Sequence, residues 1–237
     1  MKKADYTPAA MIPTKDLTPS QAVALQKKLR DQVRIEPYLG RKRYIGGADI
    51  SFNKDSDIAY VAIVVIDLKT LEPVSQAFAI HRMTFPYIPG LLSFREIPCL
   101  LAAWEQLGKA PDLLMIDGQG IAHPRRLGIA THLGILLDFP TLGCGKSRLC
   151  GSFQDLPQEA GSVSELVDHG EVIGAAFRSK NNCNPLFISP GHRMDLESSL
   201  EIVKASLRQY RIPEPTRQAH LMANQLRREN SGLLKVA

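Results

Sequence analysis

Two aspartates interrupt otherwise apolar segments, and their chemistry suggests a cation site. Asp49 lies in the β-branched, glycine-containing segment IGGADISF. An ionised carboxylate in an apolar strand costs free energy unless a cation or several hydrogen-bond donors stabilise it. Asp117 ends the segment LLMID and precedes Gly-Gln-Gly, so the chain turns where this carboxylate emerges. Two carboxylates from different strands, with oxygen as the only ligand type, suit a hard cation such as Mg²⁺.

Both aspartates also have structural interpretations that the sequence leaves open. Gly46 and Gly47 permit a bulge whose N–H groups would stabilise Asp49 without any cation. An aspartate at the end of a strand, such as Asp117, is a common turn former. Neither residue is therefore assigned to a metal site by its own surroundings.

Glu96 is the third acidic candidate. The segment from Ser93 to Glu96 matches the S-x-x-E capping box in front of an apolar helix. Pro98 conflicts with that interpretation, because it would be the fifth helical residue and would remove a helical hydrogen bond. At about 100° per residue, Glu96 lies roughly 80° from the centre of the apolar stripe. From this border of the buried face it can point towards Asp49 and Asp117.

Basic side chains follow the same expected strands. Loops at the carboxyl ends of parallel strands meet at one edge of a sheet, so we expect these bases to converge on the carboxylates. Such a combination fits metal-assisted phosphoryl chemistry, in which a lysine or histidine donates to the phosphate or to the leaving oxygen. The alternative is that the cations only neutralise Asp117. The bases are His123, Arg125 and Arg126 in IAHPRRLG, and Lys146 and Arg148 in GCGKSRLCG.

An aromatic residue on a stiff loop precedes Glu96. Tyr87 lies between Pro86 and the Ile88-Pro89-Gly90 turn. A tyrosine between prolines often serves loop packing alone. A rigid aromatic beside a site of phosphate chemistry can instead insert into a base stack and hold a distorted nucleic acid.

The elements that must position these residues follow from hydrophobic periodicity. Three strands joined by short polar turns should pair antiparallel, and the later alternation of strands with helices favours parallel pairing. This order is that of the ribonuclease-H-like fold, a mixed α/β sheet with helices on both faces. It places Asp49 inside the first strand and Asp117 at the carboxyl end of the first parallel strand. The expected strands are 44–52, 58–68, 73–81, 112–117, 141–145, and a hairpin of 171–177 with 186–189; the expected helices are 21–34 and 95–107, one from Asp195 with a stripe ending at Leu207 and Tyr210, and one after Pro215, with a further apolar segment at 127–137.

Composition limits the class of protein. The 237 residues, 44% of them hydrophobic, can bury one core, and we expect a loose arm at 1–19 and a single domain at 20–237. The longest apolar run, 58–66, is too short to cross a membrane, and the N-terminus lacks a secretory signal. Four cysteines without a C-x-x-C pair favour a reduced, cytoplasmic protein with no structural zinc site. The net charge of +5, with basic clusters at 27–43 and 204–228, permits a polyanionic partner.

The sequence resembles one family closely, endonuclease V, also called deoxyinosine 3′ endonuclease. The resemblance implies a ribonuclease-H-like fold and an enzyme dependent on Mg²⁺, for which Mn²⁺ should substitute. It further implies nicking of DNA at the second phosphodiester bond 3′ to deaminated adenine, leaving 3′-hydroxyl and 5′-phosphate ends. We expect a monomer that acts on DNA containing deoxyinosine, with inosine-containing RNA as a further substrate and no membrane partner. The segments that carry the resemblance are GGADISF, PYIPGLLSFREIP, DGQGIAHPRRLGIATHLG, GCGKSRLCG, RSKNNCNPLFISPGHR and RIPEPTR.

The resemblance also implies roles for individual residues. The three acids look like metal ligands, two bases look like catalytic or phosphate-contacting groups, and Tyr87 looks like a wedge between strands. His220 resembles a histidine near the metal, and Gln119 departs from the histidine or asparagine expected at that place. The catalytic set is Asp49, Glu96, Asp117, His123 and Lys146, and the expected DNA contacts are Tyr87, Pro86, Ile88, Gly118, Gly120 and Arg125.

Two other classes of function remain open at this point. One is a ribonuclease-H-like nuclease that acts mainly on inosine-containing RNA or on branched or flapped DNA. The other is a nucleic-acid-binding module with a vestigial site, against which the retention of all three acids argues. The residues alone indicate a metal-dependent nuclease or phosphoryl-transfer enzyme, and only the resemblance supplies inosine.

Overall fold

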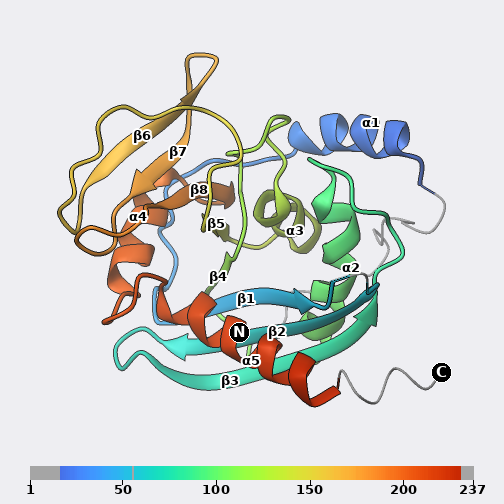
Figure 1. The fold of residues 1–237 in the computed structure, drawn as a ribbon. Coiled ribbons are helices and arrows are strands. Elements are labelled where there is room, and N and C mark those ends of the chain that lie inside the picture. Colours follow the sequence, from blue (N-terminus) through green and yellow to red (C-terminus); the bar gives the residue numbers. More distant parts are fainter. Residues whose placement is uncertain (1–16, 55, 231–237) are drawn as a thin grey trace.

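A mixed eight-stranded sheet forms the centre of the molecule. The computed structural model describes residues 17–54 and 56–230. The strand order is β3-β2-β1-β4-β5-β8-β7-β6, with β1 and β5 each parallel to β4 and the other pairs antiparallel. Helices cover both faces, with α2 and α3 on one side and α5 crossing β1 and β2 on the other (Figure 1). The expected mixed α/β, ribonuclease-H-like architecture is confirmed. The strands are β1 (Tyr44–Phe52), β2 (Ile58–Asp67), β3 (Glu72–Arg82), β4 (Leu113–Ile116), β5 (Thr141–Gly145), β6 (Val163–Asp168), β7 (Glu171–Phe177) and β8 (Leu186–His192), and the helices are α1 (Pro19–Arg30), α2 (Leu92–Glu105), α3 (Ile129–Leu137), α4 (Leu196–Ala205) and α5 (Glu214–Asn230).

Some element boundaries differ from those expected. Most of the expected arm at 1–19 lies outside the described residues, but α1 already begins at Pro19. This helix ends at Arg30 rather than Arg34, because the backbone N–H and carbonyl of Arg34 bond to His192 and Arg193 instead of continuing the helix. The strand β6 was not predicted, since Leu166 is its one buried residue and the alternation that marks a strand is weak.

The ends of two other helices also depart from the predictions. The helix α4 stops at Ala205: the Leu207 N–H donates to the Lys204 carbonyl three residues back, and the Ser206 carbonyl accepts from the Glu214 N–H, so Leu207 and Tyr210 lie beyond the helix. The helix α2 begins at Leu92, and no side chain caps it. The capping-box interpretation of Glu96 is therefore wrong.

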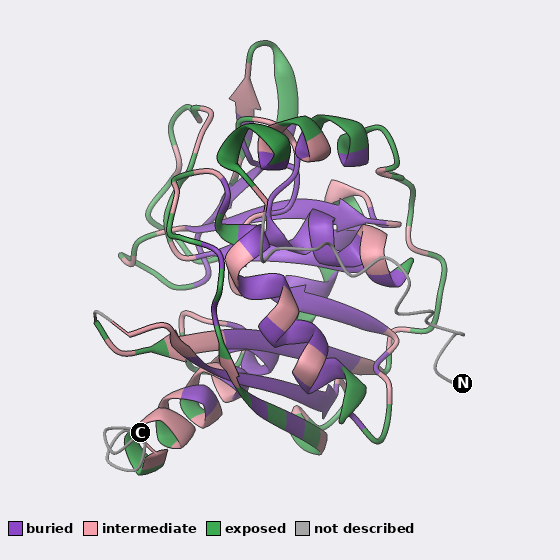
Figure 2. Ribbon diagram, turned by 90° about the vertical axis from the view of Figure 1, so that its right-hand side faces the viewer, coloured by how far each residue is buried: buried purple, intermediate pink, exposed green. Residues whose placement is uncertain are grey.

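Two cores lie on opposite faces of the sheet. One joins α2 and α3 to alternate residues of β1, β2 and β4, and the other joins α4 and α5 to the residues between them. The inner strands of the sheet are accordingly buried, whereas the edge strands β3 and β6 and the helix α1 expose much of their surface (Figure 2). All four cysteines lie within the described residues and are free. No helix in these ranges has the length and apolar character needed to span a membrane.

The register of β1 against β4 brings the two aspartates together. Ala48 pairs with Ile116 in the parallel ladder, and the N–H of Asp117 donates to the Ala48 carbonyl. The next residues, Asp49 and Asp117, therefore stand side by side where β4 ends. The pairing of β1 with β2 continues through Asp49 without a register shift, so the bulge interpretation of Gly46 and Gly47 is wrong.

The glycine at residue 47 has another physical reason. A Cβ atom added to Gly47 would lie 2.0 Å from the carbonyl carbon and oxygen of Pro215, in the first turn of α5. Backbone thus packs against backbone where α5 crosses β1. This close approach allows His220, farther along α5, to reach Asp49.

We predict that Gly47→Ala destabilises the protein by about 1–3 kcal/mol, since a methyl group forces α5 away from the sheet. Such a loss lowers the melting temperature by roughly 2–4 °C per kcal/mol in a domain of this size. Thermal unfolding measures it, with Gly108→Ala as the control because no atom lies within 4 Å of a Cβ added there. Equal melting temperatures for the two variants would contradict the close-packing explanation.

Candidate active site

Two aspartates and a histidine form the centre of the candidate site. Each of Asp49, Asp117 and His220 offers a ligand atom, and these atoms lie within 4.8 Å of one another. The His220 Nδ1–H group donates to Asp49 Oδ2 over 2.6 Å, and Asp117 Oδ2 pairs with the Lys146 ammonium. These groups line a cavity of about 270 Å³, which Glu96 also lines. Asp49, Asp117 and Lys146 come from neighbouring strands or strand ends. His220 and Glu96 come from α5 and α2, which lie on opposite faces of the sheet.

Burial makes the negative charges of the acidic cluster unfavourable. Burial and then the charge of Asp117 raise the pKa of Asp49 to about 6, although Lys146 and the hydrogen bond from His220 act in the opposite direction. Burial and then the charges of Asp49 and Asp117 raise the pKa of Glu96 to about 8. The charge of Asp117 thus disfavours the ionisation of Asp49 and Glu96, and one nearby ammonium does not compensate this effect.

The donor set fits a divalent cation. Carboxylate oxygens that face a common cavity and repel one another gain from a hard positive charge placed between them. Second contacts orient His220: Asn224 Nδ2 donates to its Nε2 over 3.0 Å, and Ser51 Oγ lies 2.9 Å from Asn224 Oδ1. Such an oriented imidazole beside carboxylates is a common feature of metal sites. Within the described ranges, this cluster is the one group of acids, histidines and cysteines that could hold a metal ion.

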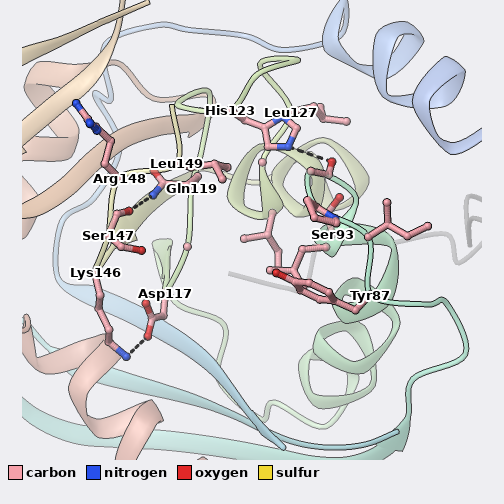
Figure 3. Close-up of a pocket in the computed structure, with 18 residues that line it drawn as sticks. Tyr87, Ser93, Asp117, Gln119, His123, Leu127, Lys146, Ser147, Arg148 and Leu149 are labelled. Atoms are coloured by element: carbon pink, nitrogen blue, oxygen red, sulfur yellow. Dashed lines mark hydrogen bonds and ion pairs between the residues drawn. The ribbon is translucent and has the colours of Figure 1, made fainter. Parts of the chain in front are cut away.

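A second cavity of about 460 Å³ adjoins the acidic one. Leu92, Asp117, Ile129 and Lys146 line both. Figure 3 shows Asp117 and Lys146 on one side of this second cavity, with Tyr87, Ser93 and His123 on the other. Tyr87 is 68% exposed at the rim. A large apolar hollow thus opens directly beside the carboxylates.

Lys146 links the two cavities. It follows β5, and Arg211 Nη2 holds its backbone carbonyl over 3.0 Å. Its ion pair with Asp117 agrees with the interpretation that it only neutralises this acid. Its place in the lining of both cavities agrees equally with a contact to a bound phosphate.

Other predicted site residues are occupied by contacts inside the protein. His123 Nε2 donates to the Gly90 carbonyl over 3.1 Å, and its Nδ1 accepts the N–H of Arg125. Burial and then the charge of Arg125 lower the pKa of His123 to about 4. The Arg125 guanidinium donates to Gly90 and to Gln26.

Four further residues that the sequence singled out are distributed differently around the cavities. Arg126 pairs with Asp168 and Glu171 and so does not join the carboxylates. The Gly120 N–H donates to Ser189 Oγ, whereas Gly118 and Arg148 line the larger cavity.

Sequence reasoning assigned no role to several residues that support the site. Gln119 donates to the Ser147 carbonyl over 2.8 Å, and its buried Oε1 has no hydrogen-bond partner in the described residues. Arg211 holds the Lys146 carbonyl from 65 residues away, and Asn224 contacts both His220, four residues earlier on α5, and Ser51 on β1. The partners of Gln119 and Arg211 are tens of residues away, so no local pattern marks these two, whereas the i, i+4 spacing of His220 and Asn224 on one helix is a local signal for Asn224.

Comparisons with known proteins agree on one family. The Endonuclease V family model matches residues 27–221. Endonuclease V of Myxococcus xanthus is 49% identical over 214 residues, covering 90% of this chain and 91% of that protein. The crystal structure of Endonuclease V from Streptomyces avermitilis superimposes with a TM-score of 0.86 at 38% identity, covering 92% of this chain and 96% of that chain. A Ciona intestinalis Endonuclease V in complex with a 24mer DNA containing an inosine followed by a ribo-adenosine gives 0.78 at 26% identity, covering 89% of this chain and 98% of that chain.

Because a buried negative charge at Glu96 is unfavourable, we predict that Glu96→Gln stabilises the metal-free protein at high pH. The pKa of Glu96 is about 8 in the folded protein and near 4.5 in the unfolded chain, so the folded protein holds the proton more tightly. The stability that the protonated side chain gives is complete below pH 4.5 and is lost as the pH rises through 8. In EDTA, the melting temperature of the variant should exceed that of the wild type at pH 8.5, by roughly 2–4 °C for each kcal/mol regained, and the difference should shrink towards pH 5. The exposed Glu159→Gln is the control. A variant less stable than the wild type at pH 8.5 would mean that Glu96 is not electrostatically strained.

Proposed function

This chain belongs to the endonuclease V family and is a nuclease that acts on DNA, and we propose that it nicks DNA containing deoxyinosine. The observation that carries this proposal is the adjacency of the acidic cavity and the larger apolar cavity, which share Asp117 and Lys146. One hollow suits phosphodiester chemistry, and the other has room for a base turned out of the helix. The Ciona relative, bound to DNA with an inosine, supports inosine as that base.

The proposal places cleavage at the second phosphodiester bond 3′ to the lesion, with 3′-hydroxyl and 5′-phosphate ends. A site of chemistry beside the base cavity, rather than inside it, agrees with a bond displaced along the strand. The proposal further assigns the protein one domain from residue 20, a monomeric state and a cytoplasmic location. Inosine-containing RNA is the second substrate to test.

The metal in this proposal is Mg²⁺, for which Mn²⁺ substitutes. Asp49, Glu96 and Asp117 would hold it, with His220 beside them. A bound Mg²⁺ would neutralise phosphate charge and lower the pKa of the attacking water. The carboxylates, which repel one another in the metal-free protein, gain most from this charge.

The remaining chemistry belongs to the side chains of the protein. Attack of water on phosphorus breaks the bond to the 3′ oxygen, which leaves with a proton and gives the 3′-hydroxyl end. In this proposal Lys146 donates to the phosphate or to this oxygen, while Arg211 fixes its backbone. His220 holds the side chain of Asp49 in place through its Nδ1–H group.

Base recognition is assigned to the larger cavity. Hypoxanthine carries an acceptor at its sixth position, where adenine carries a donor, so backbone N–H groups can distinguish the two bases without a charged side chain. Gly118, which lines the cavity directly after Asp117, is a candidate for this contact. Tyr87, with Pro86 and Ile88 beside it, would fill the gap that the extruded base leaves in the stack.

We predict that Asp117→Asn and Asp49→Asn lose cleavage but retain binding. Removing the charge of a metal ligand should lower the cleavage rate by more than the roughly 10–100-fold that follows the loss of an outer contact to such a ligand. The basic clusters at 27–43 and 204–228, which would hold the phosphates, are unchanged in both variants. Cleavage in Mg²⁺ and in EDTA, and affinity by fluorescence anisotropy, are measured on matched strands with inosine or adenine, as DNA and as RNA.

Several outcomes of that experiment would change the proposal. Wild-type cleavage that ignores inosine, or that prefers branched DNA, would overturn the proposed substrate. A preference for the RNA strand would replace DNA by RNA. Cleavage by Asp117→Asn at the wild-type rate would remove the carboxylates from the chemistry.

The two interpretations of Lys146 predict opposite results for Lys146→Ala. A group that donates to the phosphate should cost about 10²–10³ in rate when removed, with a small change in melting temperature. If Lys146 only neutralises Asp117, the rate should persist while the melting temperature falls. Single-turnover rates and thermal unfolding, compared with Lys180→Ala on the exposed surface, separate these cases.

A further inference from the structure

The loop that carries Tyr87 is held by its backbone at both ends. On one side, Arg95 Nη1 of α2 donates to the Phe85 carbonyl over 2.6 Å. On the other side, the Gly90 carbonyl accepts from three side chains, with Gln26 Nε2 at 2.9 Å and His123 Nε2 at 3.1 Å, together with the guanidinium of Arg125. Between these anchors Tyr87 projects outward. We call Gln26, His123 and Arg125 the Gly90 clamp.

Gln26 is the part of the clamp that no sequence motif marks. It belongs to α1, is fully buried, and accepts at Oε1 from Arg125 while its Nε2 donates to Gly90. A buried amide is costly unless its donors and acceptors are paired. These bonds therefore couple the position of α1 to those of the loop and of Arg125.

Apolar packing runs parallel to these hydrogen bonds. Ala22 of α1 is buried together with Phe85, Leu91 and Phe94, and Ile88 of the loop packs against this cluster. The helix lies at the margin of the molecule, away from the sheet, and exposes its outer surface (Figures 1 and 2). Its buried side is thus largely a support for the loop.

The clamp also ties the loop to the chemical site. His123 and Arg125 lie in the segment that follows Asp117 and its glycine turn. Gly90 has a φ of +77°, and a Cβ atom there would lie 2.7 Å from Arg125 Nη2, so glycine is needed for the guanidinium to reach the carbonyl. The dashed line from His123 in Figure 3 marks its hydrogen bond to the Gly90 carbonyl, and both residues line the larger cavity.

We propose that Gln26 is a positioning residue which, through the Gly90 clamp, holds Tyr87 ready to separate the strands of a duplex beside the lesion. The proposal rests on the proposed function. A side chain already fixed in its working place avoids the loss of conformational entropy on binding. This matters for a duplex, whose strands must be parted, and much less for a single strand.

The test is Gln26→Leu, which nearly preserves the volume of the side chain and removes its hydrogen bonds with Gly90, Leu127 and Arg125. The expected result is a fall of about 5–10-fold in kcat/KM for an inosine-containing duplex, the loss of one to two net hydrogen bonds, and less than about twofold for the single strand. Leu166→Ala, in the separate cluster under β6, is the control for a general loss of stability. It should leave the ratio of duplex to single-strand activity unchanged.

A double-mutant cycle tests whether Gln26 acts through Tyr87. Tyr87→Ala alone should lower the same ratio, and adding Gln26→Leu to it should lower the ratio no further. Additive losses, or equal losses on duplex and single strand, would overturn the proposal. If Gln26→Leu does not fold, Gln26→Met replaces it, since a methionine fills a similar space and lacks the amide that bonds to Gly90, Leu127 and Arg125.

Amide hydrogen exchange tests the clamp without catalysis. In Gln26→Leu, exchange should accelerate in peptides covering residues 86–92 and stay unchanged in those covering β1. Unchanged exchange at 86–92 would overturn the clamp even if the enzyme cuts inosine strands. Conversely, failure of the wild type to cut them would overturn the proposed function and leave the exchange result standing.

Discussion

Repulsion among buried carboxylates is the constraint on which the rest of the site depends. The parallel register that pairs Ala48 with Ile116 leaves Asp49 and Asp117 adjacent at the end of β4. Glu96 joins them from α2, which packs on one face of the sheet. Burial then raises the pKa values of Asp49 and Glu96. A fold that holds such groups together gives up stability in its metal-free form, which is the usual cost of a site prepared for a cation.

The elements around this cluster serve to hold it in spite of that repulsion. Gly47 lets the first turn of α5 touch β1, which brings His220 to Asp49. The turn after β5 places Lys146 against Asp117, and Arg211 fastens that turn from the segment before α5. Rigid strands and close helix packing, rather than loops alone, therefore determine the geometry of the acids.

Chemistry and base binding use neighbouring hollows with different supports. The acidic cavity is lined by residues of the sheet, α2 and α5. The larger cavity is lined on one side by the loop of Tyr87, which packs against α1. The two share Asp117 and Lys146, so a strand positioned by one is positioned for the other. His123 and Arg125 connect the supports, because they follow Asp117 in the chain and bind the loop at Gly90.

The sequence alone determined the order of elements, apart from the missed strand β6, and the identity of the acidic candidates, since hydrophobic periodicity and isolated charges are local signals. The bounds of β1, β5 and β7 agree with those expected from periodicity. Tertiary structure decided what local patterns left open or misplaced: the start of α2, which removes the capping role of Glu96, and the end of α1, where Arg34 bonds to β8 and its neighbour. It also decided that His123 and Arg125 contact Gly90 and Gln26. Hydrogen bonds between residues 33 to 99 apart in the chain depend on packing, and no spacing within a motif records them.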